Sequence, residues 1–187
     1  MLPKKFIMFP KKYPTIITLA IIMILIIWNI LIFLTPFLES PELKSTQSTI
    51  YSFFSYFCHQ LPSRSISPSD LTFGIVQNFY KFPVCTRDFA FYLFLMLGAL
   101  LFTAFRKIDS KEMPNIWWLI LAIIPTAIDG GTQLLGWRES TNLIRFLTGA
   151  PLGFVCAYYL IPLVNIFVDV FIGKKLIKWQ TQKRKQK

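Results

Sequence analysis

The chain has 187 residues, of which 54% are hydrophobic, and it carries a net charge of +11. Its mean hydropathy of +0.52 is too apolar for a soluble domain of this size, which excludes an ordinary soluble globular protein. The positive charge alone would suit nucleic acid, but no basic face interleaved with aromatic residues accompanies it. We therefore expect no nucleic-acid partner.

Four apolar stretches are long enough to cross a bilayer as helices, which takes about 20 residues. We predict an all-α integral membrane protein that forms a single membrane domain over residues 1–187, with four transmembrane helices. Their expected ranges are 14–37, 87–105, 116–135 and 143–172. Small residues on the fourth helix, Gly149, Gly153 and Ala157, would let it approach the third helix closely.

Basic residues gather in three segments that four spans would place on one side of the membrane. These segments precede the first helix, separate the second from the third, and follow the fourth, and they hold most of the 20 Lys and Arg residues. By the positive-inside rule this side is cytoplasmic, so we expect a multi-pass protein of the cell membrane with both termini inside. The basic cytoplasmic tail 173–187 would contact the lipid bilayer and could attract anionic headgroups. The first apolar run is too long for a signal peptide of roughly 7–15 apolar residues, so it should remain as an anchor.

The segment 38–86 then lies outside the cell. Apolar residues recur within it at helical spacing, opposite a row of serines, which predicts an amphipathic helix on the outer membrane surface or against the bundle. These residues are Ile50, Phe53, Phe54, Phe57 and Leu61. Three prolines follow before residue 86, so the rest of the segment is expected to be mostly irregular.

The best metal and redox ligands of the chain fall in this outer segment. Cys58 and His59 are adjacent, and Cys85 follows after a polar stretch. These three residues could bind a metal such as zinc or copper, or the two cysteines could form a disulfide on the oxidising outer face. A third alternative is a reactive thiol, because Cys85 is expected at a helix start beside Arg87, surroundings that lower a thiol pKa. All three alternatives remain open from the sequence.

A second polar set lies where the third predicted helix ends and the fourth begins. Asp129 falls within an apolar helix, where an ionisable group costs several kcal/mol and generally has a partner or a functional pathway. We expect Arg145 on the next helix to be its first partner, with Arg87 and Arg138 next. The further candidates for this outer polar site are Arg64, Asp88, Gln133, Glu139 and Asn142. A structural ion pair between two helices is the alternative to a functional site.

Four motifs carry these candidates: Cys58–Ser65, Cys85–Asp88 with Tyr92, Asp129–Gln133, and Arg138–Asn142 leading to Arg145, Thr148 and Gly149. Together they resemble a family of small prokaryotic membrane proteins catalogued as domain of unknown function 2085. The resemblance implies a multi-pass membrane protein whose motif residues act together, and it implies no particular activity.

We therefore expect one polar site under the outer surface, with the cysteines and His59 above it and the aspartate and arginines below. The leading hypothesis is a site that binds or transports a metal ion or a small polar solute. One alternative is a membrane enzyme that uses a cysteine thiolate, for thiol–disulfide exchange or for attack on a lipid-linked substrate. Another is a structural subunit of a larger complex. The chain has no glycine-rich phosphate loop, so no nucleotide cofactor is expected.

Overall fold

The structure is a computed structural model that describes residues 12–71 and 80–185, with side chains from Tyr13 to Val170 within those ranges. All regular structure in these ranges is helical, which confirms the predicted all-α class. The elements are α1 (Lys12–Leu34), η1 (Thr35–Phe37), α2 (Lys44–Phe54), η2 (Pro62–Arg64), α3 (Pro68–Leu71), α4 (Thr86–Phe105), α5 (Ile116–Leu134) and α6 (Asn142–Lys185), where η marks a 3₁₀ turn.

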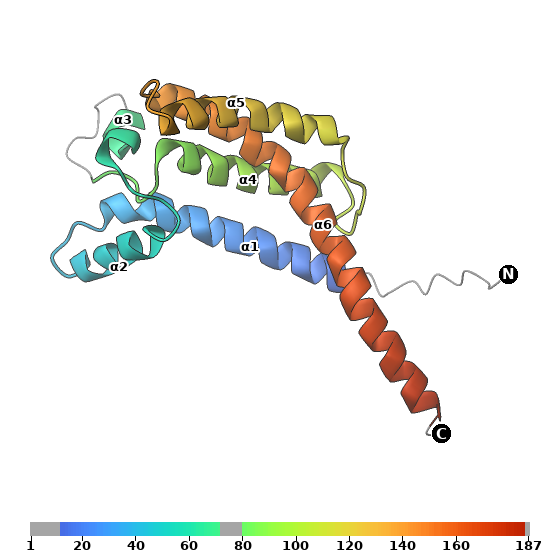
Figure 1. Ribbon diagram of the computed structural model, residues 1–187. Coiled ribbons are helices and arrows are strands. Elements are labelled where there is room, and N and C mark those ends of the chain that lie inside the picture. Colours follow the sequence, from blue (N-terminus) through green and yellow to red (C-terminus); the bar gives the residue numbers. More distant parts are fainter. Residues whose placement is uncertain (1–11, 72–79, 186–187) are drawn as a thin grey trace.

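The long helices α1, α4, α5 and α6 run back and forth between two ends of the molecule (Figure 1). The first three lie roughly along one direction, and α6 crosses them at an angle before extending beyond the bundle. One end carries α2, α3 and the turn between α5 and α6. The start of α1 and the loop between α4 and α5 lie at the other end. We call the first of these the capped end.

Three of the described helices are long and apolar enough to cross a membrane, over Tyr13–Phe37, Thr86–Phe105 and Asn142–Val170. The predicted third span, α5, has 19 residues but is not among them. Its last turns carry the polar run from Asp129 to Gln133, which lowers its hydropathy. The fourth predicted span also differs in length, because α6 continues through most of the expected tail to Lys185.

The closest helix contact joins α6 to α4 through glycines. A Cβ atom placed on Gly149 or Gly153 would collide with the backbone carbonyl of Arg87 or Phe91 of α4. In return, a Cβ on Gly98 of α4 would lie 2.8 Å from the carbonyl oxygen of Phe154 in α6. The small-residue stripe therefore does bring two helices together, but the prediction that its partner is the third predicted helix is wrong.

The helix α2 and the turn that follows it pack on the bundle through aromatic rings. Trp28 of α1 meets the rings of Phe53, Phe54 and Phe57 edge-on, with centroids 5.0–5.5 Å apart. The helix α2 ends at Phe54, so Phe57 belongs to the turn that follows it rather than to one longer helix. This packing holds the following turn, which carries Cys58, against the start of α4.

Candidate functional site

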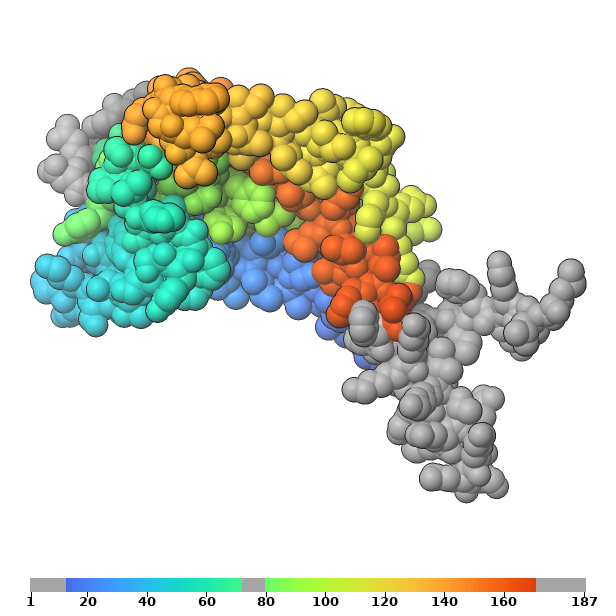
Figure 2. Space-filling view, viewed as in Figure 1, coloured from blue at the N-terminus to red at the C-terminus, as the bar shows by residue number. Residues whose placement is uncertain are grey.

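Two groups of polar side chains lie at the capped end. We call the first the thiol cluster, which consists of Cys58, Cys85 and Asp88. We call the second the arginine cluster, which consists of Arg64, Arg87, Asp129, Gln133, Arg138, Asn142 and Arg145. In Figure 2 the turn between α5 and α6, in orange, touches the segment that carries α2 and η2, in cyan to green.

A turn held by Gln60 positions Cys58. Gln60 has a φ of 51°, a left-handed conformation that is uncommon for a residue with a side chain. Its side-chain nitrogen donates to the carbonyl oxygens of Tyr51, at 2.6 Å, and Pro83, at 3.0 Å. These bonds join the end of α2 to the irregular stretch before α4, and so bring Cys58 and Cys85 together. The Tyr51 hydroxyl donates to the carbonyl of Lys81, and burial raises the pKa of Tyr51 to about 12, so it stays a donor at neutral pH.

The thiol cluster is a pair of free cysteines beside a carboxylate. The backbone N–H of Cys85 donates to Sγ of Cys58 at 3.1 Å, and Sγ of Cys85 donates to Oδ2 of Asp88 at 3.2 Å. The single proton of the Cys85 thiol can instead be donated to Sγ of Cys58, and this hydrogen bond lowers the pKa of Cys58 from its ordinary value, although burial opposes the effect. The same hydrogen bond, together with burial and the charge of Asp88, raises the pKa of Cys85. Cys58 is therefore the sulfur that loses its proton first.

The predicted metal ligands Cys58, His59 and Cys85 do not come together as a set. The ligand atoms of Cys58, Cys85 and Asp88 lie within 4.8 Å of one another, whereas His59 is exposed and outside this group. The reason is local, because the turn after α2 directs consecutive side chains to different sides. Metal binding by the predicted set is therefore not supported, and Asp88 takes the place expected for His59 beside the two sulfurs.

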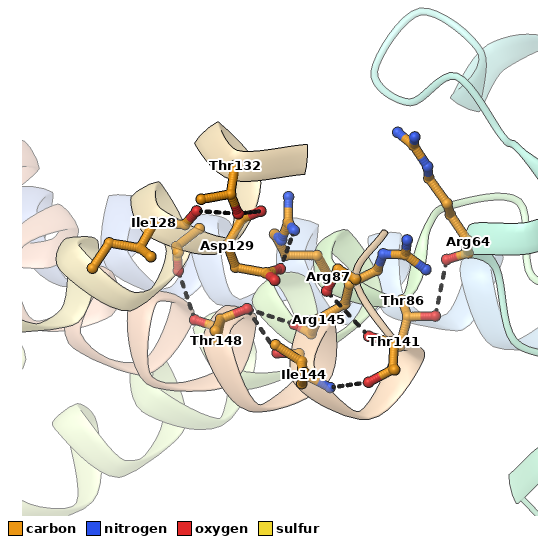
Figure 3. Close-up of polar contacts among 12 residues, drawn as sticks. Arg64, Thr86, Arg87, Ile128, Asp129, Thr132, Thr141, Ile144, Arg145 and Thr148 are labelled. Atoms are coloured by element: carbon orange, nitrogen blue, oxygen red, sulfur yellow. Dashed lines mark hydrogen bonds and ion pairs between the residues drawn. The ribbon is translucent and has the colours of Figure 1, made fainter. Parts of the chain in front are cut away.

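Asp129 is the buried acid of the arginine cluster, with 2% of its surface exposed. Its Oδ2 forms an ion pair with Nη2 of Arg87, and its Oδ1 accepts a hydrogen bond from Nη2 of Arg138 at 2.7 Å. Figure 3 shows Arg87 of α4 reaching Asp129 of α5. The predicted pairing of Asp129 with Arg145 is thus wrong, because α6 packs most closely on α4 and this contact brings Arg87 to the carboxylate instead.

Arg138 reaches Asp129 because the chain reverses after α5. Gly136 has a φ of +71°, and the N–H of Trp137 donates back to the carbonyl oxygen of Thr132 at 3.0 Å. Helices commonly end in this way, with a glycine in the left-handed conformation and the following N–H groups donating to carbonyl oxygens of the last turn that would otherwise lack a partner. Nε of Arg138 then donates to the hydroxyl of Thr132 at 3.1 Å. The guanidinium is fixed over the end of α5.

Arg145 is equally buried, with 2% of its surface exposed, but its partners among the described residues are all neutral. Nη1 donates to Oδ1 of Asn142 at 2.9 Å and to the carbonyl oxygen of Ser63 at 3.4 Å. When the amide of Gln133 is assigned so that its oxygen faces the two guanidiniums, this oxygen accepts from Nη2 of Arg145 at 2.7 Å and from Nε of Arg64 at 3.1 Å. The buried Nε atoms of Arg145 and Arg87 have no hydrogen-bond partner among the residues that the structure describes.

The remaining predicted residues divide between the clusters and the surface. Asp88 belongs to the thiol cluster, and Glu139 stays at the edge, 78% exposed and 3.9 Å from Arg64. Sequence reasoning missed two contributors, the Thr132 hydroxyl and the Ser63 carbonyl. The first lies inside a recognised motif, whereas a backbone carbonyl carries no signal in the sequence. A third missed contact joins the clusters, since the Thr86 hydroxyl donates to the carbonyl oxygen of Arg64 at 3.0 Å (Figure 3).

Comparison with known proteins places both clusters within one family. The DUF2085 family of predicted membrane proteins matches residues 58–159. An uncharacterised protein of Methanocaldococcus jannaschii is 36% identical over 169 residues, which cover 88% of this chain and 98% of that protein. A second uncharacterised protein, from Methanothermobacter thermautotrophicus, is 36% identical over 107 residues, or 54% of this chain and 80% of that protein. No solved structure matches the chain. The chain therefore belongs to the DUF2085 family of predicted membrane proteins.

Proposed function

We propose that this protein spans the cell membrane four times and binds a small oxyanion, such as a phosphate or carboxylate group, at an outward-facing arginine cluster. The observation that supports this proposal most directly is Arg145. It is buried, it forms no ion pair with a carboxylate among the described residues, and it has an unpartnered Nε. A buried charge without a counter-charge costs several kcal/mol, and an anion bound beside it would recover much of that cost.

The balance of charge in the cluster favours an anion over a cation. The cluster contains four guanidiniums, those of Arg64, Arg87, Arg138 and Arg145, but only one buried carboxylate, Asp129, which pairs with Arg87 and Arg138. The exposed carboxylate of Glu139 lies at the edge of the cluster, 3.9 Å from Arg64. A structural ion pair accounts for Asp129 with its two partners, but it leaves Arg64 and Arg145 sharing the neutral oxygen of Gln133. Two like charges that meet at one neutral oxygen repel each other, and a bound oxyanion would reverse the sign of that interaction.

The chemistry of the donors points to an oxyanion. Guanidinium groups present parallel N–H donors at a spacing that matches two oxygens of a carboxylate or phosphate. The same chemistry could come from a free solute or from the headgroup of a lipid at the membrane surface. Of the two ligands expected from the sequence, a metal ion or a small polar solute, an oxyanion corresponds to the second.

The fourth span rests on α5. Apolar side chains along this helix point outward, among them Leu121 and Ile128, each 59% exposed, as expected for a lipid-facing surface. Tryptophans flank it, with Trp117 near its start and Trp137 just beyond its end, as in the aromatic belts of membrane proteins. The helix from Trp117 to Leu134 is about 26 Å long at 1.5 Å per residue, close to the hydrocarbon thickness. Four spans put both termini on the cytoplasmic side, with the basic end of α6 near anionic headgroups.

Oxyanion binding can be measured by its effect on stability. Purified protein in neutral detergent would be unfolded with and without phosphate, pyrophosphate or acetate at constant ionic strength. A ligand at one hundred times its Kd should raise the free energy of unfolding by about 2.7 kcal/mol. Nanodiscs of neutral lipid, with or without a phosphate-headgroup lipid, distinguish a free solute from a headgroup.

Matched variants locate the binding site. Arg145→Gln and Arg138→Gln should lose the stabilisation, and Arg138 serves as the second probe because its side chain is 40% exposed and less critical for folding. Arg106→Gln is the control, since Arg106 is equally exposed and pairs with Glu112 at the opposite end of the bundle. The proposal is refuted if the anions stabilise all three variants equally, or if none of these anions stabilises the wild type.

A further inference from the structure

The thiol cluster has features that oxyanion binding does not require. Two free cysteines lie in contact at the start of α4, separated by 26 residues along the chain but brought together by the Gln60 turn. A third cysteine, Cys156, lies within α6 and outside the cluster. The pairing of Cys58 with Cys85 is therefore a product of the fold around the capped end.

The two sulfurs are placed differently. Cys58 accepts the N–H of Cys85 at the N-terminal end of α4, where the helix dipole and the donated hydrogen bond both stabilise a thiolate. Cys85 instead donates to a carboxylate, Oδ2 of Asp88 in the first turn of the same helix. One sulfur is set up to attack, and the other holds a proton that a neighbouring base can accept.

We propose that Cys58 and Cys85 form a thiol–disulfide exchange pair that reduces a disulfide-bearing substrate at the capped end of the protein. The thiolate of Cys58 attacks one sulfur of the substrate disulfide, and the other substrate sulfur leaves as a thiolate and takes a proton from solvent. Cys85 then transfers its proton to Asp88 and attacks Sγ of Cys58. This step forms the Cys58–Cys85 disulfide and releases the second substrate thiolate, which takes that proton. The protein loses two electrons and the substrate gains them.

The two sulfurs are close enough for this disulfide to form after a small movement. The Sγ atoms of Cys58 and Cys85 lie within 4.8 Å of each other, and Sγ of Cys58 is 3.1 Å from the backbone nitrogen of Cys85. To form the bond, the sulfur of Cys85 must leave the carboxylate of Asp88 and approach Cys58 to about 2.05 Å. Asp88 thereby acts twice. It accepts the proton of Cys85 before the Cys58–Cys85 bond forms, and it donates this proton to the released substrate thiolate afterwards.

Equilibration with mercaptoethanol and its disulfide tests whether the pair is redox-active. In a Cys156→Ala background, we expect the oxidised fraction of the pair to rise from about one tenth to about nine tenths as the reagent becomes more oxidising. This rise takes a roughly hundredfold fall in the ratio of the squared thiol concentration to the disulfide concentration. The exchange is stopped by alkylation of free thiols, and the mass of the protein then shows two alkyl groups for the reduced pair or none for the disulfide. A pair that stays oxidised throughout is a structural disulfide, and one that stays reduced with bound metal is a metal site. Either result overturns the proposal.

Trapping assigns the order of attack. Cys85→Ser should accumulate a mixed disulfide on Cys58, whereas Cys58→Ser should accumulate far less on Cys85. Equal or reversed trapping overturns the assignment. Asp88→Asn should prolong the life of the mixed disulfide in the otherwise intact pair about a hundredfold, since it removes the base. Asp70→Asn is its control, because Asp70 is an exposed acid of the same outer segment that bonds only to Ser67 among the contacts described.

This inference goes beyond oxyanion binding and does not rest on it. Mercaptoethanol and its disulfide carry no charge, so loss of the arginine cluster would not remove their exchange with the thiols. A protein that exchanges disulfides but is not stabilised by oxyanions would support the second proposal alone, and the reverse result would support the first alone.

Discussion

Replacing Gly153 by alanine should destabilise the protein, because the new methyl group would enter the backbone of α4. A Cβ at this position would collide with the carbonyl oxygen of Phe91 and would lie 2.9 Å from both its carbonyl carbon and its Cα. These atoms belong to a helix backbone and cannot rotate away, so α4 and α6 would have to separate. Overpacking of this kind costs about 1–3 kcal/mol, and a rigid backbone neighbour favours the upper part of that range.

The matched control is Gly131→Ala in α5. Gly131 also lies within a helix, but a Cβ there would meet nothing within 4 Å. Alanine gains about 0.5–1 kcal/mol over glycine in a helix, and because both variants make the same exchange this gain cancels between them. The difference between the two variants therefore isolates the packing cost, at about 1–3 kcal/mol.

The assay is reversible unfolding in mixed micelles of a mild and a denaturing detergent, followed by circular dichroism. Gly131→Ala should be as stable as the wild type or slightly more stable, and Gly153→Ala clearly less stable. If Gly153→Ala proves as stable as Gly131→Ala, the close contact between α4 and α6 is wrong. The placement of Arg87 beside Asp129, which depends on that contact, would then lose its basis.

Three further predictions concern topology, the buried ion pair and the thiols. In a background without native cysteines, an impermeant thiol reagent should label cysteine at Tyr56, which is 86% exposed, and miss cysteine at Glu112, whose side chain is 85% exposed; the reverse pattern would invert the membrane orientation. Asp129→Asn and Arg87→Gln should each cost about 3–5 kcal/mol of unfolding free energy and the double variant less than their sum, whereas strict additivity would deny the pairing. The rate of Cys58 alkylation should rise with pH, because the thiol is unreactive while protonated, and the midpoint of this rise should lie below the ordinary thiol pKa of about 8.5. Cys85→Ala should raise the midpoint, since it removes the thiol that donates a hydrogen bond to Cys58. An unchanged midpoint would show that the Cys85 side chain does not stabilise the thiolate.

The sequence alone predicted the helical class and most of the helix positions, because both follow from local composition. The apolar runs predicted α1, α4 and α6 to within a few residues at the capped end, and the polar motifs indicated which end of the molecule carries the candidate site. The small-residue stripe predicted a close helix contact. These features depend on hydropathy, spacing and residue size, which neighbouring positions in the chain already contain.

Only the tertiary structure decided which of these features meet. The stripe on α6 could face any helix, and its packing on α4 is what gives Asp129 the guanidinium of Arg87 and leaves Arg145 with neutral partners. The turn at Gln60 likewise brings Cys58 to Cys85 and excludes His59, although His59 is the neighbour of Cys58 in sequence. Such pairings depend on helix order and on the direction of single side chains in turns. Both are set by the packing of distant segments, which no local pattern in the sequence contains.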